Sequence, residues 1–426
     1  MGTNTFKLHV TGITKTTSID VVEDIKFTVQ FELKANYKGE FGFDWMRDDY
    51  SNGISLNYED LKKEYKETQI NDQDYFVPYL SMFPNQEGVI LNLKLDILQG
   101  KARKDDIIKL PAIDGIKFDP EEVKVKDLEK EQVEVKVICE SVLSQDTSIE
   151  LLDKNDNPVG EIIVVKNDEV YDLEIKFVKV CWERHLDKLK EKFNRTITDL
   201  ESFMANNSLN QALIKPKIVE KNYNNIEYIK IDDLPEDLLT GGSFLNSKGR
   251  RELKKISESA RNFKGIVIFY LGLEHQNIKA GDAQTFPLDD QFVFLYLNSS
   301  YSRDLSHEIG HTLGLSHTFP EDSTMGTRLE ATLDNYEGQL TRQRATLGDE
   351  SYDQEQVNAN VSKLESMIEI QKQSIEDYNS VGRNNSHKFE EGKTTNLMDY
   401  SSPEKTLDFF QWQWKIMQKE VIKYYN

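Results

Sequence analysis

The sequence predicts a multidomain protein, with all-β, sandwich-like modules in roughly the first 170 residues and an α/β (α+β) domain after them. Two observations support this division. In the first part apolar and polar residues alternate with a period of two, whereas in the second part strand-like runs alternate with helical patterns. The chain has 426 residues, of which 38% are hydrophobic, and this length fits two or three domains with cores of their own.

The β prediction rests on several short runs. Residues 27–33 and 133–139 have an apolar side chain at almost every second position. Two more apolar runs, 149–152 and 162–165, flank the segment 153–158, whose Asn, Asp and Pro residues are typical of a turn. These runs therefore predict strands joined by tight connections.

A stretch rich in Lys and Asp, residues 101–106, interrupts the β pattern. Charged stretches without periodicity are typical of linkers, so we expect a domain boundary there. The prediction is a β-sandwich-like module over residues 1–105 and a small, immunoglobulin-like β module over residues 106–171.

The pattern changes near Tyr171. Amphipathic helices are predicted over 186–200 and 253–263, where apolar residues recur at steps of three and four. Strands are predicted at 173–180, 214–219, 226–231, 266–271 and 292–297. This alternation predicts an α/β domain over residues 172–426.

Residues 327–380 carry two apolar stripes at helical spacing, separated by a break at 348–353. The second stripe follows a heptad pattern in which Gln371 fills one polar position. We expect an antiparallel helical hairpin inserted in the second domain. It is either a solvated spacer or a lid or partner-docking arm.

The charge balance limits the partners. The formal net charge is −21, the opposite of what a sequence-independent nucleic-acid binder needs, and an anionic membrane surface is disfavoured for the same reason. No apolar run approaches 18 residues, so no membrane span is expected. The N-terminus does not resemble a secretory signal. Any export would therefore proceed without a general signal peptide. We expect export or delivery outside the producing cell by such a route, with a cytoplasmic location left open.

Residues 307–317 read His-Glu-Ile-Gly-His-Thr-Leu-Gly-Leu-Ser-His and hold three of the seven histidines. Residues four apart on a helix differ by about 40° in direction, so His307 and His311 present their imidazoles from one face. Gly314 can leave the helical conformation without steric cost, and the turn brings back His317. Glu308 lies beside the first histidine and reaches the same cleft.

Three imidazoles are a ligand set for tetrahedral Zn²⁺ that leaves one position for water. The metal lowers the pKa of that water, and Glu308 can take its proton as a general base. The alternative is a structural zinc site or a hydrogen-bonded histidine cluster. Structural zinc sites usually close with a fourth protein ligand, often Cys, and no cysteine lies near residues 307–317.

These residues resemble the metzincin metalloproteases, whose signature is the longer His-Glu-x-x-His-x-x-Gly-x-x-His string followed by a methionine turn. The segment Asn-Leu-Met-Asp-Tyr-Ser at 396–401 is similar to the turn of the pappalysin branch. The resemblance implies that Met398 packs beneath the metal as an apolar floor. Met325 is the alternative, at a spacing similar to that of matrixins, but Met398 precedes the last predicted helix, 406–425, as such a turn should.

The resemblance implies two further roles. A tyrosine at the place of Tyr400 lies near the metal in related enzymes and could stabilise an oxyanion. The alternative is a buried tyrosine with a satisfied hydroxyl group. The strand at 292–298 occupies the place of the edge strand that binds extended peptide antiparallel, and the alternative is an ordinary core strand.

Together these features predict a zinc-dependent endopeptidase that hydrolyses a protein or peptide substrate. It could be broad, or narrow enough to cut one protein only. The β-modules would then target, bind substrate or dock a partner such as a secretion machine, as in a delivered or secreted bacterial effector. The alternative is a binding or adhesion protein in which the protease domain is latent or a scaffold. The intact Glu308 and complete histidine set argue against that alternative.

Overall fold

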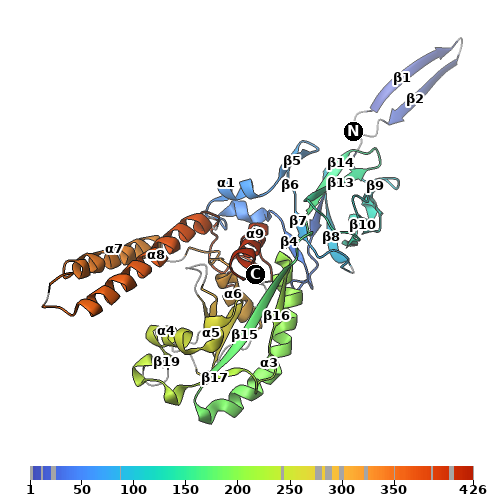
Figure 1. Cartoon of the computed structure of the whole chain (residues 1–426). Coiled ribbons are helices and arrows are strands. Elements are labelled where there is room, and N and C mark those ends of the chain that lie inside the picture. The colour runs from blue at the N-terminus through green and yellow to red at the C-terminus, as the bar shows by residue number, and fades with distance from the viewer. Residues whose placement is uncertain are drawn as a thin grey trace.

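The computed structural model describes residues 3–10, 13–20, 25–86, 88–240, 244–273, 281–283, 290–296, 302–320, 325–349, 351–384, 387–402 and 407–425. It is a multidomain protein of mixed α and β structure. A hairpin of β1 (Thr3–Val10) and β2 (Ile13–Asp20) precedes a β-sandwich, and an α/β domain with a long helical hairpin follows (Figure 1).

Two sheets form the β-sandwich. The first has the order β10-β12-β8-β3 and the second β11-β9-β13-β14-β7-β4. The strands of the first sheet are β3 (Lys26–Glu32), β8 (Val89–Gln99), β10 (Ile116–Asp119) and β12 (Val133–Cys139). Those of the second are β4 (Gly42–Asp44), β7 (Tyr79–Ser81), β9 (Ile107–Lys109), β11 (Glu122–Lys124), β13 (Thr147–Asp153) and β14 (Pro158–Val164).

The predicted boundary between modules 1–105 and 106–171 is wrong. Strand β8 pairs with β12, and β7 pairs with β14, so both sheets join strands from either side of residue 105. One buried apolar core, from Phe27 to Val164, fills the sandwich. The stretch 101–106 is the polar loop between β8 and β9. Its charges indicated a linker because surface loops and linkers share that composition.

Several short elements extend the sandwich. A two-stranded sheet is formed by β5 (Glu67–Ile70) and β6 (Gln73–Phe76). The helical turns are η1 (Asp48–Asn52), α1 (Tyr58–Leu61), η2 (Lys62–Glu64) and α2 (Val125–Leu128). The turn predicted at 153–158 is confirmed, with Asp156 at a φ of 66° between β13 and β14. Asx residues tolerate that left-handed conformation.

The α/β domain is built on a sheet of order β16-β15-β20-β22-β21, in which β17 also pairs with β15. All pairs are parallel except β21–β22. The strands are β15 (Tyr171–Cys181), β16 (Ile214–Ile218), β17 (Glu227–Lys230), β20 (Ile266–Leu271), β21 (Gly281–Ala283) and β22 (Phe292–Leu295). The positions of β15, β16, β17, β20 and β22 agree with the predicted apolar runs. Parallel strands that are buried on both faces have continuous apolar sequences, and this made them recognisable.

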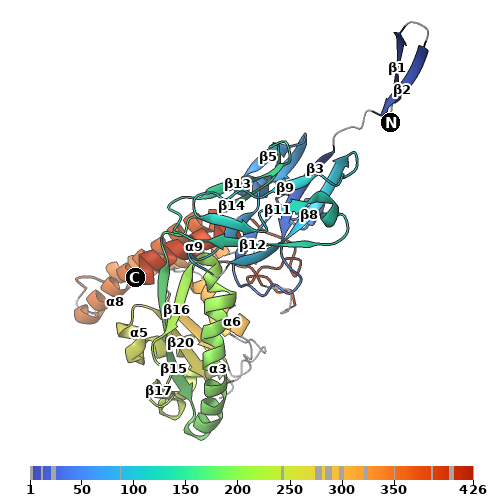
Figure 2. The same ribbon diagram turned by 90° about the vertical axis from the view of Figure 1, so that its right-hand side faces the viewer.

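Helices cover both faces of this sheet (Figure 2). The helices α3 (Leu186–Asn207) and α6 (Ser302–Thr312) share one apolar core with one face, and α4 (Ser247–Ile256) and α5 (Glu258–Asn262) share another core with the opposite face. The single helix predicted over 253–263 is therefore two helices. Ser257 interrupts it with an extended backbone, and its Oγ accepts a hydrogen bond from Ala260 N at 3.1 Å as the cap of α5.

The strand predicted at the sheet edge is not the edge. β22 pairs with β20 on one side and with β21 on the other, so β21 ends the sheet order. The sequence pattern missed β21 because it has three residues, Gly-Asp-Ala, with little apolar content. The last two residues of the expected 292–298 strand lie outside the described residues.

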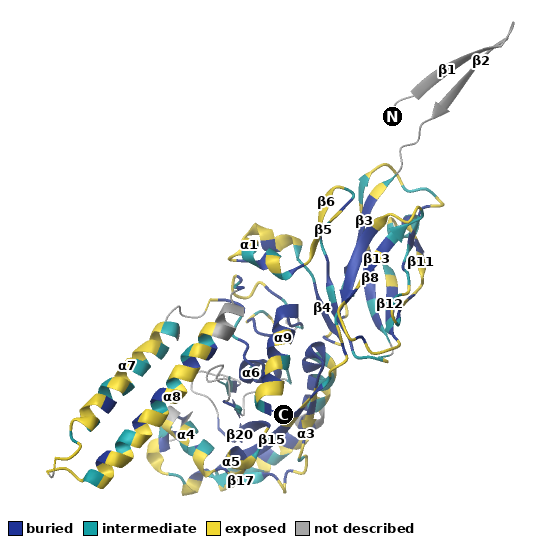
Figure 3. Ribbon diagram, turned by 45° about the horizontal axis from the view of Figure 1, so that its top comes forward, coloured by how far each residue is buried: buried dark blue, intermediate teal, exposed yellow. Residues whose placement is uncertain are grey.

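The helical hairpin predicted over 327–380 is confirmed as α7 (Met325–Arg344) and α8 (Gln354–Asn384). It projects from the α/β domain, and most of its surface is exposed (Figures 1 and 3). The apolar seam between the helices is narrow and consists of Leu333, Tyr336, Leu340, Val361, Leu364 and Ile368. The polar heptad residue Gln371 donates a hydrogen bond across the seam to Leu329 O at 2.9 Å.

The chain ends with α9 (Gln411–Glu420) and one further helical turn, Val421–Tyr425. Nearly all of α9 is buried between the sandwich and the α/β domain. Within the described residues, no helix combines the length and apolar character needed to cross a membrane.

Candidate metal centre

Helix α6 carries the first two predicted ligands. His307 and His311 lie one turn apart and are 9% and 7% exposed. The helix ends just before Gly314, whose φ of +82° is the left-handed conformation that a glycine adopts without cost. Leu315 N then donates a hydrogen bond to Gly310 O at 2.9 Å, which closes the helix end. The turn brings His317 back toward the helix, as the sequence predicts.

The three imidazoles converge through their Nε2 atoms. Nε2 of His317 lies 3.1 Å from Nε2 of His307 and 3.2 Å from Nε2 of His311. Ligand nitrogens at about 2.0–2.1 Å from a tetrahedral metal are separated by about 3.3 Å. The spacing observed between the histidines is close to that value. This group could therefore hold a metal ion.

Backbone carbonyls orient two of the rings. Nδ1 of His307 lies 2.7 Å from Leu397 O, and Nδ1 of His311 lies 2.7 Å from Leu315 O. A carbonyl only accepts, so each Nδ1 carries the proton and each Nε2 presents a lone pair to the shared point. Burial, and secondarily the neighbouring His317, lowers the pKa of His307 to about 3. The ring is thus neutral at physiological pH, which is the form that binds metal.

Met398 of the predicted methionine turn packs against helix α6. It is fully buried in the core beneath α6, and a Cβ added to Gly310 would lie 2.6 Å from its sulfur atom. Helix α6 therefore contacts the sulfur atom at Gly310, which lies between His307 and His311 in the sequence. The alternative residue, Met325, is the first residue of α7. Its side chain lies outside the described part of the chain.

Two polar residues that the sequence analysis did not single out shape this turn. The carboxylate of Asp399 accepts hydrogen bonds at 2.8 Å from the backbone N–H groups of Gly392 and Thr394. Asn396 Oδ1 accepts another from Met398 N at 2.9 Å. Asx side chains bind nearby backbone groups in this way in turns, and this was the available signal.

Glu308 points toward the edge of the sheet. A Cβ added to Gly281 of β21 would lie 2.6 Å from Cγ and 3.0 Å from Oε1 of Glu308. The carboxylate of Glu308 therefore lies against the edge strand. A side chain at residue 281 would push it away, so Gly281 is a positioning residue that the sequence analysis missed.

Tyr400 lies over the histidines and is not the buried tyrosine of the alternative prediction. It is 58% exposed, and its ring centroid is 4.7 Å from that of His317 and 5.8 Å from that of His307. Phe319 packs against it at 4.9 Å. The phenol is thus held by ring contacts at the open side of the site.

The third histidine is tied to a distant part of the chain. Lys388 Nζ donates hydrogen bonds to His317 O at 2.5 Å and to Ser316 Oγ at 3.0 Å. Lys388 belongs to the segment after the helical hairpin, and its own carbonyl accepts a hydrogen bond from Leu56 N at 2.8 Å. A loop of the β-sandwich therefore supports the backbone of a predicted metal ligand.

A buried ion-pair network joins the same two parts. Arg47 lies 2.8 Å from Asp44 in the sandwich and 2.8 Å from Asp408 beside the methionine turn. Asp408 also accepts a hydrogen bond from Thr395 Oγ1 at 2.7 Å. Burial raises the pKa of Asp44 and of Asp408, whereas the charge of Arg47 opposes that shift. No sequence motif marks these residues, because they meet only in the folded chain.

No family model and no curated protein matches this chain. One solved structure with partial similarity is described as "Structure of a chaperone-substrate complex", at 15% sequence identity and a TM-score of 0.26. The match covers 38% of this chain and 26% of that chain, so it spans about a quarter of the other protein. A TM-score this low does not establish a common fold.

Proposed function

We propose that this protein is a zinc-dependent endopeptidase of the metzincin type. One observation carries the proposal, namely that three imidazoles converge on one point while the glutamate next to the first of them packs on the edge strand of the sheet. The residues involved are His307, His311, His317, Glu308 and Gly281.

The donor set favours zinc. Three imidazole nitrogens suit a borderline-soft ion, and catalytic zinc sites commonly have three protein ligands. In the described part of the chain, no Cys, Asp or Glu joins the histidines as a further member of the group. When bound, zinc polarises a carbonyl and makes a water molecule more acidic.

The residues around this point have distinct roles in the proposed reaction. Glu308 takes the proton of the attacking water and passes it to the leaving amine as a general base and acid. Tyr400, exposed beside His317, donates a hydrogen bond from its hydroxyl group to the developing oxyanion. Met398 supports the helix from below, and the two backbone carbonyls keep the histidines in one tautomer.

The substrate in this proposal binds as an extended strand. Among the described strands β21 pairs with β22 alone, and the proposal places the peptide on the other edge of β21. The edge strand of the prediction is thereby reassigned from residues 292–298 to Gly281–Ala283. The peptide then runs past Glu308, which packs on Gly281.

The test compares wild type with Glu308→Ala on unfolded casein and a mixed peptide library, with metal content measured for both. We expect bound zinc in both proteins and cleavage in the wild type only, with a loss of about 10²-fold or more, because the base acts in the transition state. Glu330→Ala, an exposed carboxylate on α7, is the matched control and should cleave like the wild type.

The alternative is a binding or adhesion protein that keeps the protease domain as a scaffold. Zinc in stoichiometric amount with no hydrolysis of any peptide or protein would favour it. Equal cleavage by wild type and Glu308→Ala would contradict the proposed base. Delivery outside the producing cell and docking on a secretion machine stay predictions.

A further inference from the structure

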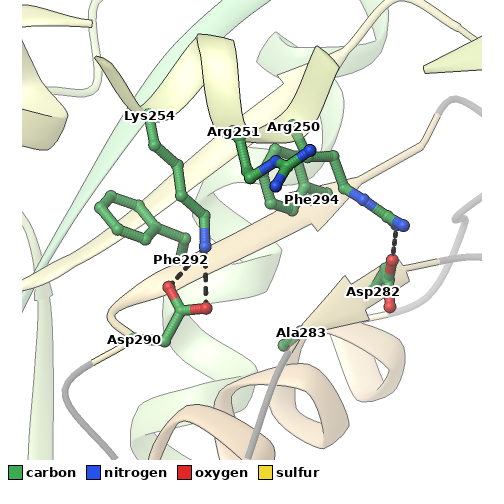
Figure 4. Close-up of a pocket in the computed structure, with 8 residues that line it drawn as sticks. All are labelled: Arg250, Arg251, Lys254, Asp282, Ala283, Asp290, Phe292 and Phe294. Carbon is green, nitrogen blue, oxygen red and sulfur yellow. Dashed lines mark hydrogen bonds and ion pairs between the residues drawn. The ribbon is translucent and has the colours of Figure 1, made fainter. Parts of the chain in front are cut away.

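A cavity lies beside the edge strand β21. It has a volume of about 280 Å³ and opens between α4 and the strands β21 and β22 (Figure 4). It lies on the face of the sheet that α4 covers, opposite to the face covered by α6. Its lining consists of Arg250, Arg251, Lys254, Asp282, Ala283, Asp290, Phe292 and Phe294.

Within the described part of the chain, two of the three cations of this pocket form ion pairs with its carboxylates, and the third does not. Lys254 Nζ lies 2.7 and 2.8 Å from the two carboxylate oxygens of Asp290, which is 7% exposed. Arg250 forms an ion pair with Asp282. Arg251 is exposed at the mouth, and the described residues include no ion-pair partner for it. Three cations thus face two carboxylates, a local positive excess in a chain of net charge −21.

Strand register decides which part of a bound peptide meets this pocket. Asp282 pairs with Phe294, and both lie on the α4 face. Gly281 pairs with Leu295, and both lie on the α6 face, where Gly281 contacts Glu308. A peptide added to the outer edge of β21 continues this alternation. The residue next to the one at Gly281 therefore turns its side chain toward α4.

We propose that this pocket is a substrate subsite for an acidic side chain, which Arg251 binds. The inference rests on the proposed function, because it needs a peptide strand on β21. Arg250 already neutralises Asp282, so the carboxylate at the strand edge does not repel an incoming acid. A basic substrate side chain would have to displace Arg250 to reach the same carboxylate.

The two phenylalanines that line the pocket, Phe292 and Phe294, also suit an acidic side chain. Phe292 and Phe294 lie beneath Lys254, whose Nζ is 4.7 Å from the centroid of Phe292. These rings can contact the methylene groups of a glutamate while its carboxylate reaches the guanidinium at the mouth. Glutamate, with two methylenes, is therefore favoured over aspartate.

The subsite lies on the amino side of the cleaved bond. The resemblance to the metzincins implies that the peptide runs antiparallel to the edge strand β21, and the slightly greater stability of antiparallel pairing favours the same direction. Asp282 and Ala283 follow Gly281 along β21. The peptide residues opposite them therefore precede the residue that lies at Glu308, where the bond is cut.

The test is a peptide-library cleavage map for three proteins: wild type, Arg251→Glu and Lys255→Glu. Lys255 lies on the same helix, is exposed and outside the pocket, so its reversal is the matched control. We expect wild type and Lys255→Glu to prefer Glu on the amino side of the cut. Arg251→Glu should lose this preference, and kcat/KM for a Glu-containing peptide should fall about tenfold while its Gln counterpart changes little.

A binding measurement separates failure of the subsite from failure of the proposed function. Fluorescein-labelled decapeptides of Ala and Thr, with one Glu or one Gln, are titrated onto the Glu308→Ala protein with and without Arg251→Glu. Tighter binding of the Glu peptide that Arg251→Glu abolishes supports the subsite even where no protein cleaves. Equal affinity for the two peptides, or cleavage without preference for Glu, overturns it.

Discussion

At the residue scale, buried polar side chains pack against the turns that position the histidines of the candidate centre. Glu420 of α9 is the clearest case. It is 5% exposed and packs against the turn that returns His317, where a Cβ added to Gly314 would lie 3.1 Å from its Cγ. Burial, and then the charge of Asp377 on α8, raises its pKa to about 7, whereas Lys423 opposes the shift.

This pKa predicts how stability depends on pH. An unfolded glutamate titrates near 4.5 and the folded one near 7, so the folded chain holds the extra proton between these values. The contribution of this group to stability is therefore lost as pH rises from about 4.5 to 7. Glu420→Gln should raise the free energy of unfolding at pH 8 by roughly 1–3 kcal/mol and have little effect at pH 4.

Denaturant unfolding at the two pH values measures this difference. Lys419→Gln changes an exposed charge on the same helix and is the control. A stabilisation that is equal at pH 4 and pH 8 would show that the carboxyl group is not the cause.

At the element scale, the edge strand β21 and the helix α6 are packed closely together. Glu308 of the helix fills the space that a side chain at Gly281 of the strand would need. On the other side of α6, the sulfur atom of Met398 fills the space that a side chain at Gly310 would need. Both contacts use the missing side chain of a glycine, so the helix is clamped between strand and turn. Neither contact involves a predicted metal ligand directly.

Gly281→Val should therefore lower kcat of the proposed peptidase by about 10- to 100-fold while zinc content stays the same. The added side chain displaces Glu308 but leaves the three histidines in place. Gly338→Ala on α7, where an added Cβ meets nothing within 4 Å, is the control. Loss of zinc together with activity would mean that the strand supports the ligands rather than the base.

The helical hairpin is a separate element with its own small core. Its seam residues lie far along α7 and α8 and do not belong to the core beneath the histidines. Replacing residues 333–368 by a short Gly/Ser linker should leave zinc content and cleavage of small peptides unchanged, as expected of a spacer. A large change in peptide kcat/KM would favour the lid. A change confined to protein substrates would favour the docking arm.

At the scale of the whole molecule, the β-sandwich is a support of the candidate centre as well as a candidate docking module. Arg47 joins it to Asp408 beside the methionine turn, and the loop before α1 pairs with the segment that holds His317. The carboxylates of Asp44 and Asp408 are almost fully buried. Removing their shared cation leaves both without compensation.

Arg47→Ala should consequently lower the free energy of unfolding by about 3–5 kcal/mol and accelerate zinc loss to a chelator. Lys26→Ala removes an exposed pair with Asp72 in the same sandwich and should cost less than about 1 kcal/mol. Chemical denaturation and chelator-transfer kinetics measure both. If Arg47→Ala unfolds the sandwich while the proposed zinc site keeps its affinity for the metal, the two parts are independent.

The sequence by itself determined the local features of this protein. The histidine spacing and Gly314 predicted that the three imidazoles lie together, because these residues belong to one helix and the turn after it. The strand runs and the hairpin were equally readable, since each depends on a short periodic pattern.

The tertiary structure decided everything that depends on residues far apart in the chain. The single sandwich, the edge position of β21, the support of His317 by Lys388 and the Arg47 network all join segments separated by tens to hundreds of residues. Strand order and buried ion pairs leave no periodic signal, because which surfaces meet is set by packing of whole elements. The pocket at Arg251 arises in the same way, from a helix and two strands that meet only in the fold.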